Sequence, residues 1–384
     1  MTAERVADGS TPLDPDFGVS LAPAEFEERF LTLHKELFAS DTQGFDEVTV
    51  HAYAPPAGSY QVDHCFFHDG RNLHLYYVTG DMRNTEAWIA AYRAGDYEKA
   101  NQVCLEPGCG HAVGPDLFGL QYRDTLLFEP EGRFDLASRS NAQVFAFDSG
   151  GPRRYGLLYG VRGGAPDGTP FVGFNLTWSP DLETWAGGDG NPAWGPPAWC
   201  KKGSTCKDAH VMRFGDRYLL YYIAMDRHGY ACIALASTLD WRTIDDHGVV
   251  LALPPSLRGT MGIESPFVLH RHGMWHLFYT YGEGLHHAVS PSPGGFVAAR
   301  GNTWDVGTGA YLMGPYHATE IVEQDGRTYL TTDRKEHTRK LNRVAGVLRY
   351  RGSYEDEKTL EEGIYVAEIE WHGDRPVLRK PERP

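Results

Sequence analysis

One pattern that occurs five times along the chain constrains the fold more than any other feature. In each copy a polar residue opens a short apolar strand, a turn with glycine follows, and an aromatic-rich strand usually comes next. Successive turn glycines are 81, 64, 58 and 53 residues apart, so each unit has room for about four short strands. The five copies cover residues 62–80, 141–161, 207–226, 263–282 and 316–333.

Five such units predict an all-β fold, a five-bladed β-propeller. A single hairpin cannot bury both of its faces, whereas four-stranded units arranged around an axis can. Third strands are visible at 171–185 and 230–244, and each ends in a serine, an aspartate beside a leucine, and a tryptophan. The stretches 344–352 and 363–371 would complete the fifth blade. The 44 glycines and 24 prolines supply the turns that many short strands need.

The pattern divides the chain into an N-terminal extension, 1–45, and a propeller domain, 46–384. Within the extension Phe26, Phe30, Leu33 and Leu37 recur at helical spacing, which predicts one amphipathic helix over 23–38. Residues 85–94 fit either a helix or a strand with a loop.

Charge and composition exclude several classes of partner. The formal net charge of −15 repels phosphate backbones and anionic lipid, so we expect neither nucleic acid nor membrane as a partner. No apolar run approaches the roughly 20 residues of a membrane span. Residues 1–16 lack the apolar core of a secretory signal, which favours the cytoplasm, with a processed exported form as the alternative. The six cysteines lack zinc spacing and are expected to be reduced thiols.

The residues that open the five inner strands are predicted to face one central cavity. Three of the five are carboxylic acids, and acids crowded together raise one another's pKa. Two carboxyl groups with opposed pKa values are the machinery of glycoside hydrolysis, and a third can tune the acid. The five residues are Asp63, Asn141, Asp208, Glu264 and His317.

Asp63, Asp208 and Glu264, in the first, third and fourth repeats, resemble the acid triad of family 43 propeller glycoside hydrolases, the arabinanases, arabinofuranosidases and β-xylosidases. The string KDAHVMRFGDRYLLYY is similar to the family's Asp-Pro-His-Val strand, IESPFVLHRHGMWHLFY to its Glu-x-Pro strand, and GPYHATEIVEQDGRTYL to its Gly-Pro-x-His strand. The resemblance covers residues 60–335. It implies an inverting hydrolase of a furanoside or xyloside linkage, with Asp63 as base, Glu264 as acid and Asp208 as pKa modulator.

Two other functions stay open at this point. Family 32, which cleaves sucrose and fructans, also carries Asp, Asp and Glu on the same propeller. A retaining fructosidase or fructosyltransferase would use Asp63 as the nucleophile. The chain has Val-Asp-His, Lys-Asp-Ala and Glu-Ser-Pro, which differ from the motifs of both families. The third reading is a propeller that binds carbohydrate, or serves a biosynthetic pathway, without hydrolysing it.

Further residues are expected to contact an oligosaccharide or small glycoside. Phe66, Trp194 and Trp199 are candidates to stack on sugar faces, and Asn141 to hydrogen-bond a sugar hydroxyl. Arg334 could reach the cavity and pair with Asp208. The family resemblance implies that His317 lies on the axis and helps hold a cation, a calcium ion, through water. No other cofactor is expected.

Overall fold

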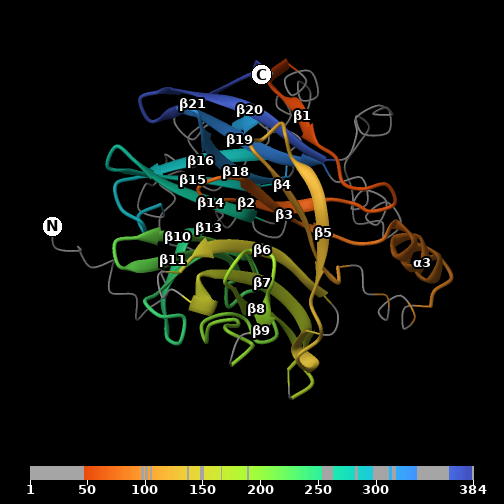
Figure 1. Cartoon of the computed structure of the whole chain (residues 1–384). Coiled ribbons are helices and arrows are strands. Elements are labelled where there is room, and N and C mark those ends of the chain that lie inside the picture. Colours follow the sequence, from red (N-terminus) through yellow and green to blue (C-terminus); the bar gives the residue numbers. More distant parts are fainter. Residues whose placement is uncertain are drawn as a thin grey trace.

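The predicted five-bladed propeller is confirmed by a computed structural model, in which five sheets surround a common axis (Figure 1). We call each sheet a blade and number the blades in chain order. The predicted extension 1–45, its helix over 23–38, and the predicted strand 344–352 lie outside the described residues. The structure describes residues 47–96, 99, 103, 106–135, 138–147, 151–165, 167–187, 190–252, 263–281, 284–296, 311–313, 317–334 and 363–382.

Four blades are antiparallel sheets of four consecutive strands, with the first strand innermost. Blade 1 contains β2 (Val62–His68), β3 (Leu73–Thr79), β4 (Gly108–Gly114) and β5 (Gln121–Leu127). Blade 2 contains β6 (Ser138–Ala146), β7 (Tyr155–Gly164), β8 (Pro170–Ser179) and β9 (Ala186–Gly187). Blade 3 contains β10 (Cys206–Phe214), β11 (Arg217–Met225), β12 (Ala231–Thr238) and β13 (Ile244–Ala252). Blade 4 contains β14 (Ile263–Arg271), β15 (Met274–Tyr281), β16 (Gly284–Ser290) and β17 (Tyr311–Met313).

Blade 5 joins the two ends of the propeller. The predicted strand at 363–371 is present, and its neighbour on one side is the first strand of the propeller rather than a later one. Val50 of β1 is paired with Val366 of β20, and Tyr53 with Ile364. This pairing closes the ring, and Figure 1 shows red β1 beside blue β20. The strands are β18 (His317–Gln324), β19 (Arg327–Arg334), β20 (Gly363–His372), β1 (Val50–Tyr53) and β21 (Arg375–Arg379).

The middle strands are buried on both faces because each one packs between two neighbouring blades. Along β11 successive side chains point to opposite faces. Tyr221 therefore belongs to a cluster shared with blade 4, and Tyr222 to a cluster shared with blade 2. Both tyrosines are fully buried. The near-continuous apolar composition of this strand follows from this two-sided burial.

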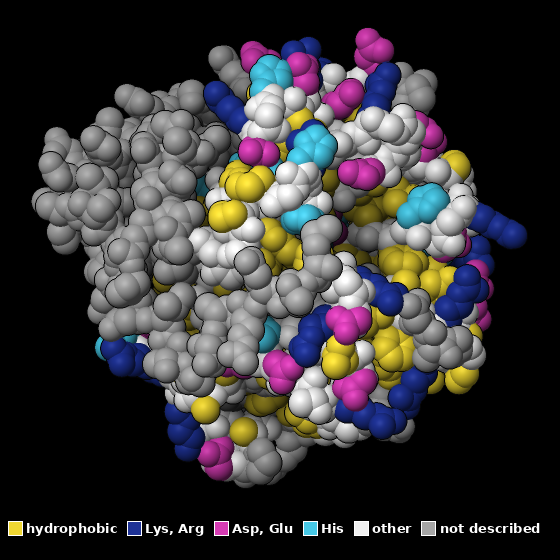
Figure 2. Space-filling model, turned by 90° about the vertical axis from the view of Figure 1, so that its left-hand side faces the viewer, with side chains coloured by type: hydrophobic (Ala, Val, Ile, Leu, Met, Phe, Trp, Pro, Cys, Tyr) yellow, Lys and Arg dark blue, Asp and Glu magenta, His cyan; other side chains and the backbone are white. Residues whose placement is uncertain are grey.

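Outside the strands, the undecided segment near residue 90 is helical, as α3 (Met82–Arg93). Two short 3-10 turns, η1 (Arg133–Asp135) and η2 (Gly151–Arg153), flank β6. No helix in the described ranges is both long and apolar enough to cross a bilayer. The described cysteines, five in number, are all free thiols. On the face drawn in Figure 2, acidic and basic side chains are interspersed rather than separated by sign.

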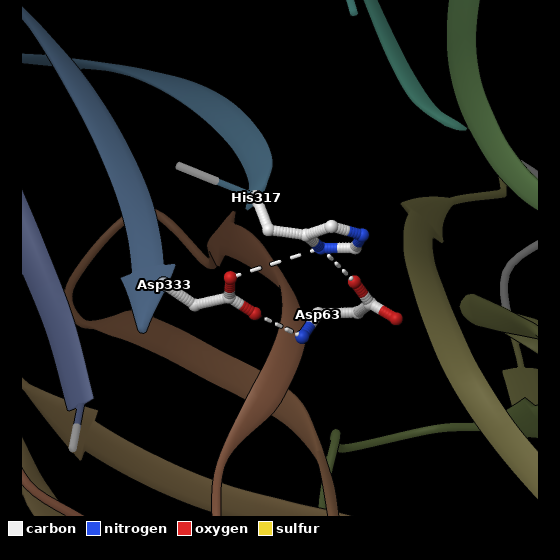
Figure 3. Close-up of side chains that lie close together, drawn as sticks. All are labelled: Asp63, His317 and Asp333. Atoms are coloured by element: carbon white, nitrogen blue, oxygen red, sulfur yellow. Dashed lines mark hydrogen bonds and ion pairs between the residues drawn. The ribbon is translucent and has the colours of Figure 1, made fainter. Parts of the chain in front are cut away.

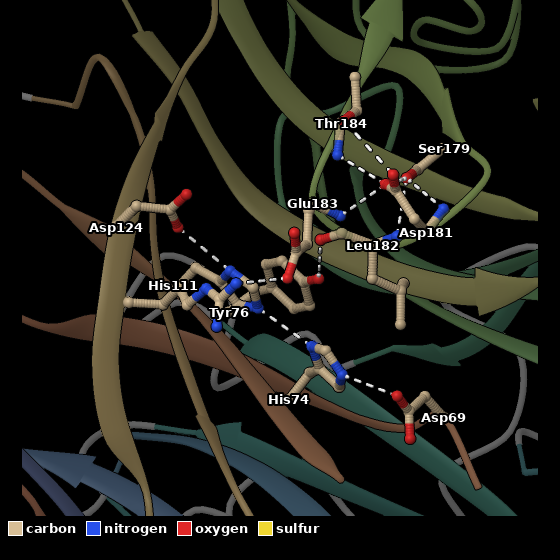
Figure 4. Close-up of polar contacts among 11 residues, drawn as sticks. Asp69, His74, Tyr76, His111, Asp124, Ser179, Asp181, Leu182, Glu183 and Thr184 are labelled. Carbon is tan, nitrogen blue, oxygen red and sulfur yellow. Dashed lines mark hydrogen bonds and ion pairs between the residues drawn. The ribbon is translucent and has the colours of Figure 1, made fainter. Parts of the chain in front are cut away.

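A buried polar chain links three strands of blade 1 (Figure 4). His74 of β3 lies 3.3 Å from Asp69 and 3.0 Å from His111 of β4, and His111 lies 3.1 Å from Asp124 of β5. Burial lowers the pKa of both histidines, that of His111 to about 4. Tyr76 stacks on His111 and donates a hydrogen bond to a carbonyl of blade 2. Through Tyr76, this polar chain of side chains therefore connects blade 1 to blade 2.

Candidate active site

Each inner strand contains one residue in the left-handed conformation close to its start. The pairing with the second strand shifts at this point in all five blades, so the residue forms a bulge. Aspartate and asparagine tolerate this conformation better than most side chains, and they occupy three of the five positions. The bulge residues, with φ between 39° and 56°, are Asp63, Asn141, Asp208, Ser265 and Ala318.

The bulges correct the register that the repeat suggested. Glu264 and His317 lie one residue before the bulge, whereas Asp63 and Asp208 lie on it. The position equivalent to Glu264 in blade 3 is therefore Lys207. Counting back to the turn glycine could not show this offset, because the distance from bulge to turn varies between blades. We call the starts of the five inner strands the rim. Polar side chains come from two kinds of position there, the bulge itself and the residue before it.

Asp63 and Glu264 come together at the rim, because both contact His317. The Nδ1 atom of His317 lies 2.9 Å from Asp63 Oδ1, and its Nε2 atom lies 2.7 Å from Glu264 Oε2. The three side chains are 18–34% exposed, so each remains accessible from the rim. An imidazole can donate at both nitrogens only when it is protonated. This geometry therefore suits a proton shared among His317 and the two carboxyl groups.

Lys207 is a member of this site that the sequence analysis did not identify. Its ammonium lies 2.8 Å from Glu264 Oε1 and 3.1 Å from Asp208 Oδ2. Burial alone would lower the pKa of Lys207, but Asp208, Glu264 and Asp63 outweigh burial and raise it above its usual value. Lys207 therefore stays charged and compensates the acids. Aligning Lys207 with Glu264 across the repeats is the sequence feature that could have revealed it.

Asp208 is held from two sides and is almost fully buried. Asn141 Nδ2 donates a 2.6 Å hydrogen bond to Asp208 Oδ1, while Lys207 approaches Oδ2. Burial raises the pKa of Asp208, Asp63 and Glu264 raise it further, and Lys207 opposes them. In this structure Asn141 thus positions Asp208, although the sequence suggested a direct contact with sugar.

A fourth carboxyl group, Asp333 of β19, lies beneath His317 (Figure 3). Asp333 is fully buried, accepts a hydrogen bond from the backbone amide of Asp63, and lies 3.8 Å from His317 Nδ1. One ligand atom from each of Asp63, His317 and Asp333 could together contact a cation, since these atoms lie within 4.8 Å of one another. Asp333 is opposite His317 in the sheet, a pairing visible only once the register is known.

Below the rim, the axial cavity has a volume of only about 40 Å³, well below that of typical ligand sites. A sugar ring must therefore contact the rim from its outer side. Glu320 lines this cavity and accepts a 2.9 Å hydrogen bond from Gln143. Burial raises the pKa of Glu320 to about 8, although the bonds from Gln143 and the Phe66 amide oppose the shift. At neutral pH Glu320 is therefore mainly a neutral acid.

The aromatic residues that were predicted to contact sugar differ in their surroundings. Phe66 is half-buried and packs against the core shared by blades 1 and 5, so its contact with sugar stays a prediction. Trp199 donates a 2.6 Å hydrogen bond to Asp246 and packs against the core of blades 2 and 3. Trp194 stacks on Phe174 but also lines an open cleft. Arg334 ends β19, and its side chain lies outside the described part of the structure.

The arrangement brings four carboxyl groups, one ammonium and one imidazole to a single rim. Such a set can hold a proton on one carboxyl group and leave another ionised, which general acid–base chemistry requires. The acids outnumber the cations, so the reacting part of any ligand should be neutral or positively charged.

Comparison with solved structures agrees with the fold. The chain is similar to a family 32 β-fructofuranosidase from Bombyx mori, with 16% identity, a TM-score of 0.56, and coverage of 94% of this chain and 70% of that one. A thermostable family 43 glycoside hydrolase is 14% identical, with a TM-score of 0.54 and coverage of 86% of this chain and 97% of that one. A xylan β-1,4-xylosidase from Bacillus halodurans is 12% identical, with a TM-score of 0.53 and coverage of 85% of this chain and 56% of that one.

At this level of identity the comparisons establish the propeller fold of these enzymes. No protein-family model matches the chain. No curated protein matches its sequence either.

Replacing Lys207 by methionine should destabilise the protein at neutral pH. The substitution leaves Asp208 and Glu264 without their shared cation, which we expect to cost about 2 kcal/mol or more. The loss should shrink near pH 4, where protonated carboxyl groups need no cation. Chemical unfolding at both pH values, with Lys380→Met as an exposed control, measures this difference. An equal loss at the two pH values would contradict the charge-balancing role.

Glu320→Gln should remove a pH dependence of stability. The unfolded chain releases the Glu320 proton near pH 4.5, whereas the folded chain keeps it up to about 8. Stability of the wild type should therefore fall as the pH rises through this window, by at most about 1.4 kcal/mol per unit. We expect a smaller fall for Glu320→Gln than for the exposed Glu323→Gln on the same strand. Parallel melting profiles between pH 5 and 8 would exclude this assignment.

Proposed function

We propose that this protein is a glycosidase that cleaves a furanoside or xyloside linkage by inverting acid–base catalysis. Asp63 acts as general base, Glu264 as general acid, and Asp208 sets the protonation of Glu264. The observation that carries the proposal is that a single imidazole, His317, contacts both Asp63 and Glu264, one at each ring nitrogen.

The contacts of Glu264 suit the acid role. Its Oε1 atom is approached by the ammonium of Lys207, which stays charged, and its Oε2 atom by the imidazole of His317, which can carry a proton. Glu264 can therefore be recharged from His317 after it has protonated the leaving oxygen. Asp63 Oδ1 faces His317 and is suited to accept a proton from water.

The alternative enzyme is a retaining fructosidase, in which Asp63 attacks the sugar directly. The similarity to a family 32 fold supports it as well as the family 43 similarity supports the first proposal. The two differ in carboxyl separation, roughly 6.5–9.5 Å for inversion and about 5–5.5 Å for retention. Anomer detection by NMR on the first product formed separates them. A propeller that binds sugar without cleaving it would release no product from any substrate.

A cation at His317 is part of the proposal, but no catalytic step depends on it. The donors at hand are two carboxylates and one imidazole, whereas calcium prefers six to eight oxygens, so waters would complete its shell. If the cation is present, a chelator should lower the melting temperature, and His317→Ala should abolish the response to the chelator. A melting temperature that is indifferent to chelation would remove the cation from the proposal.

Paired substitutions test the catalytic roles. Glu264→Gln should lower cleavage of arabino- and xylo-oligosaccharides by about 10²–10⁴-fold. Aryl glycosides with good leaving groups need little protonation and should lose much less. Asp63→Asn should abolish turnover of both substrate types, because no water is activated.

Asp325→Asn and Glu323→Gln, exposed acids at the hairpin end of β18, are the matched controls and should retain full activity. Full activity of Glu264→Gln on an oligosaccharide would refute the acid assignment. Full activity of Asp63→Asn would refute the base.

A further inference from the structure

A second cavity, apart from the axial one, opens on the same end of the propeller as the rim. Its volume is about 560 Å³, within the range typical of ligand sites. Its walls include Phe171 at the start of β8 and the segment from Trp194 to Gly203. We call it the blade 2–3 cleft.

The topology fixes the position of this cleft relative to the rim. Asn141 and Asp208 lie near the starts of β6 and β10, and antiparallel order brings the start of β8 to that same end. Lys201 is hydrogen-bonded through its backbone amide to Met225, the last residue of β11. Gly203 precedes Lys207 by four residues, so the two are at most about 14 Å apart. One oligosaccharide could therefore reach both sites.

The apolar wall of the cleft is rigidly built. A Cβ on Gly173 or Gly195 would come within 2.7 Å of the Phe171 ring, so glycine at these positions lets the ring pack closely. Trp194 is held by backbone hydrogen bonds in both directions to Phe174. Prolines follow at 196 and 197. Preformed aromatic surfaces of this kind suit the apolar face of a sugar ring.

The polar wall is cationic in a protein of net charge −15. Lys202 pairs with Asp167 at 3.0 Å, but these side chains are 79% and 53% exposed, and such surface pairs are weak. Lys201 is exposed and, within the described residues, has no carboxylate at ion-pair distance. Its side chain lies over Gly229, in the turn between β11 and β12. Two ammonium groups beside aromatic rings favour a sugar that carries a carboxylate.

The two sites differ in charge, and this difference orients a ligand. The rim holds the acids Asp63, Asp208, Glu264 and Asp333, which disfavour a carboxylate on the reacting sugar. The lysines of the cleft favour that carboxylate on a neighbouring unit.

On the basis of the function proposed above, we propose that the substrate is an acidic oligosaccharide whose neutral sugar is cleaved at the rim while a uronate unit binds in the blade 2–3 cleft. Lys201 and Lys202 contact the carboxylate, and Phe171 and Trp194 contact the ring.

Binding to the full-length chain carrying Glu264→Gln tests this proposal, because that variant should not consume the probes. The probes are glucuronate-substituted xylotriose and, as its neutral match, xylotetraose, measured by titration calorimetry. The acidic probe should bind about tenfold or more tightly than the neutral one at low salt. The preference should weaken at 0.5 M salt, which screens exposed charges.

Substitutions assign the preference to the cleft. Lys201→Gln with Lys202→Gln should abolish it without changing the affinity for xylotetraose, and Lys380→Gln, on blade 5, should leave it intact. Phe171→Leu should weaken both probes alike. Equal affinity for the two probes, no binding of either, or a preference that survives the double substitution would each overturn the proposal.

The outcome is distinguishable from failure of the proposed function. Hydrolysis of neutral glycosides by the wild type without any acidic preference would leave the glycosidase proposal standing and refute the cleft. Tighter binding of the acidic probe, without hydrolysis of any glycoside, would support the cleft and refute the glycosidase proposal.

Discussion

The balance of charge on the propeller axis is the constraint on which the centre of this structure depends. Five inner strands converge there and bring three carboxyl groups, joined by Asp333 of β19, into contact range of one ammonium and one imidazole. Without Lys207 the acids would repel one another in a poorly hydrated space. Lys207 is thus the main counter-ion of the rim.

The fold was predictable because the same hairpin pattern occurs five times along the chain. Turn glycines and aromatic-rich strands mark the four-stranded units even where the exact ends of the strands are not known. The site was predictable only in part. Asp63, Glu264 and His317 were found because polar residues opening apolar strands are conspicuous, and they do meet. Lys207 was missed because its neighbour Asp208 supplied a simpler explanation, and Asp333 because its role depends on cross-strand register.

The bulges explain why register could not be inferred by counting. Each bulge adds a residue to one strand only, and the hairpins differ in length, so distance from the turn is not constant. The surroundings of Phe66 also depend on the register of its strand. Side chains alternate between the two faces of a strand, so a shift of one residue decides which neighbouring blade a side chain meets. Along β2, Cys65 and Phe67 pack toward blade 2, whereas Phe66 packs toward blade 5.

Closure of the ring by β1 has a consequence for biosynthesis. About 310 residues separate Tyr53 from its partner strand β20, so at 5–20 residues per second β1 waits roughly 15–60 s on the ribosome for its partner. During that interval the nascent propeller is an open arc with two free strand edges, which are templates for pairing with other chains. β20, which is made after the strands of the other four blades, therefore also covers these edges, and a chain truncated before residue 363 would keep both of them exposed.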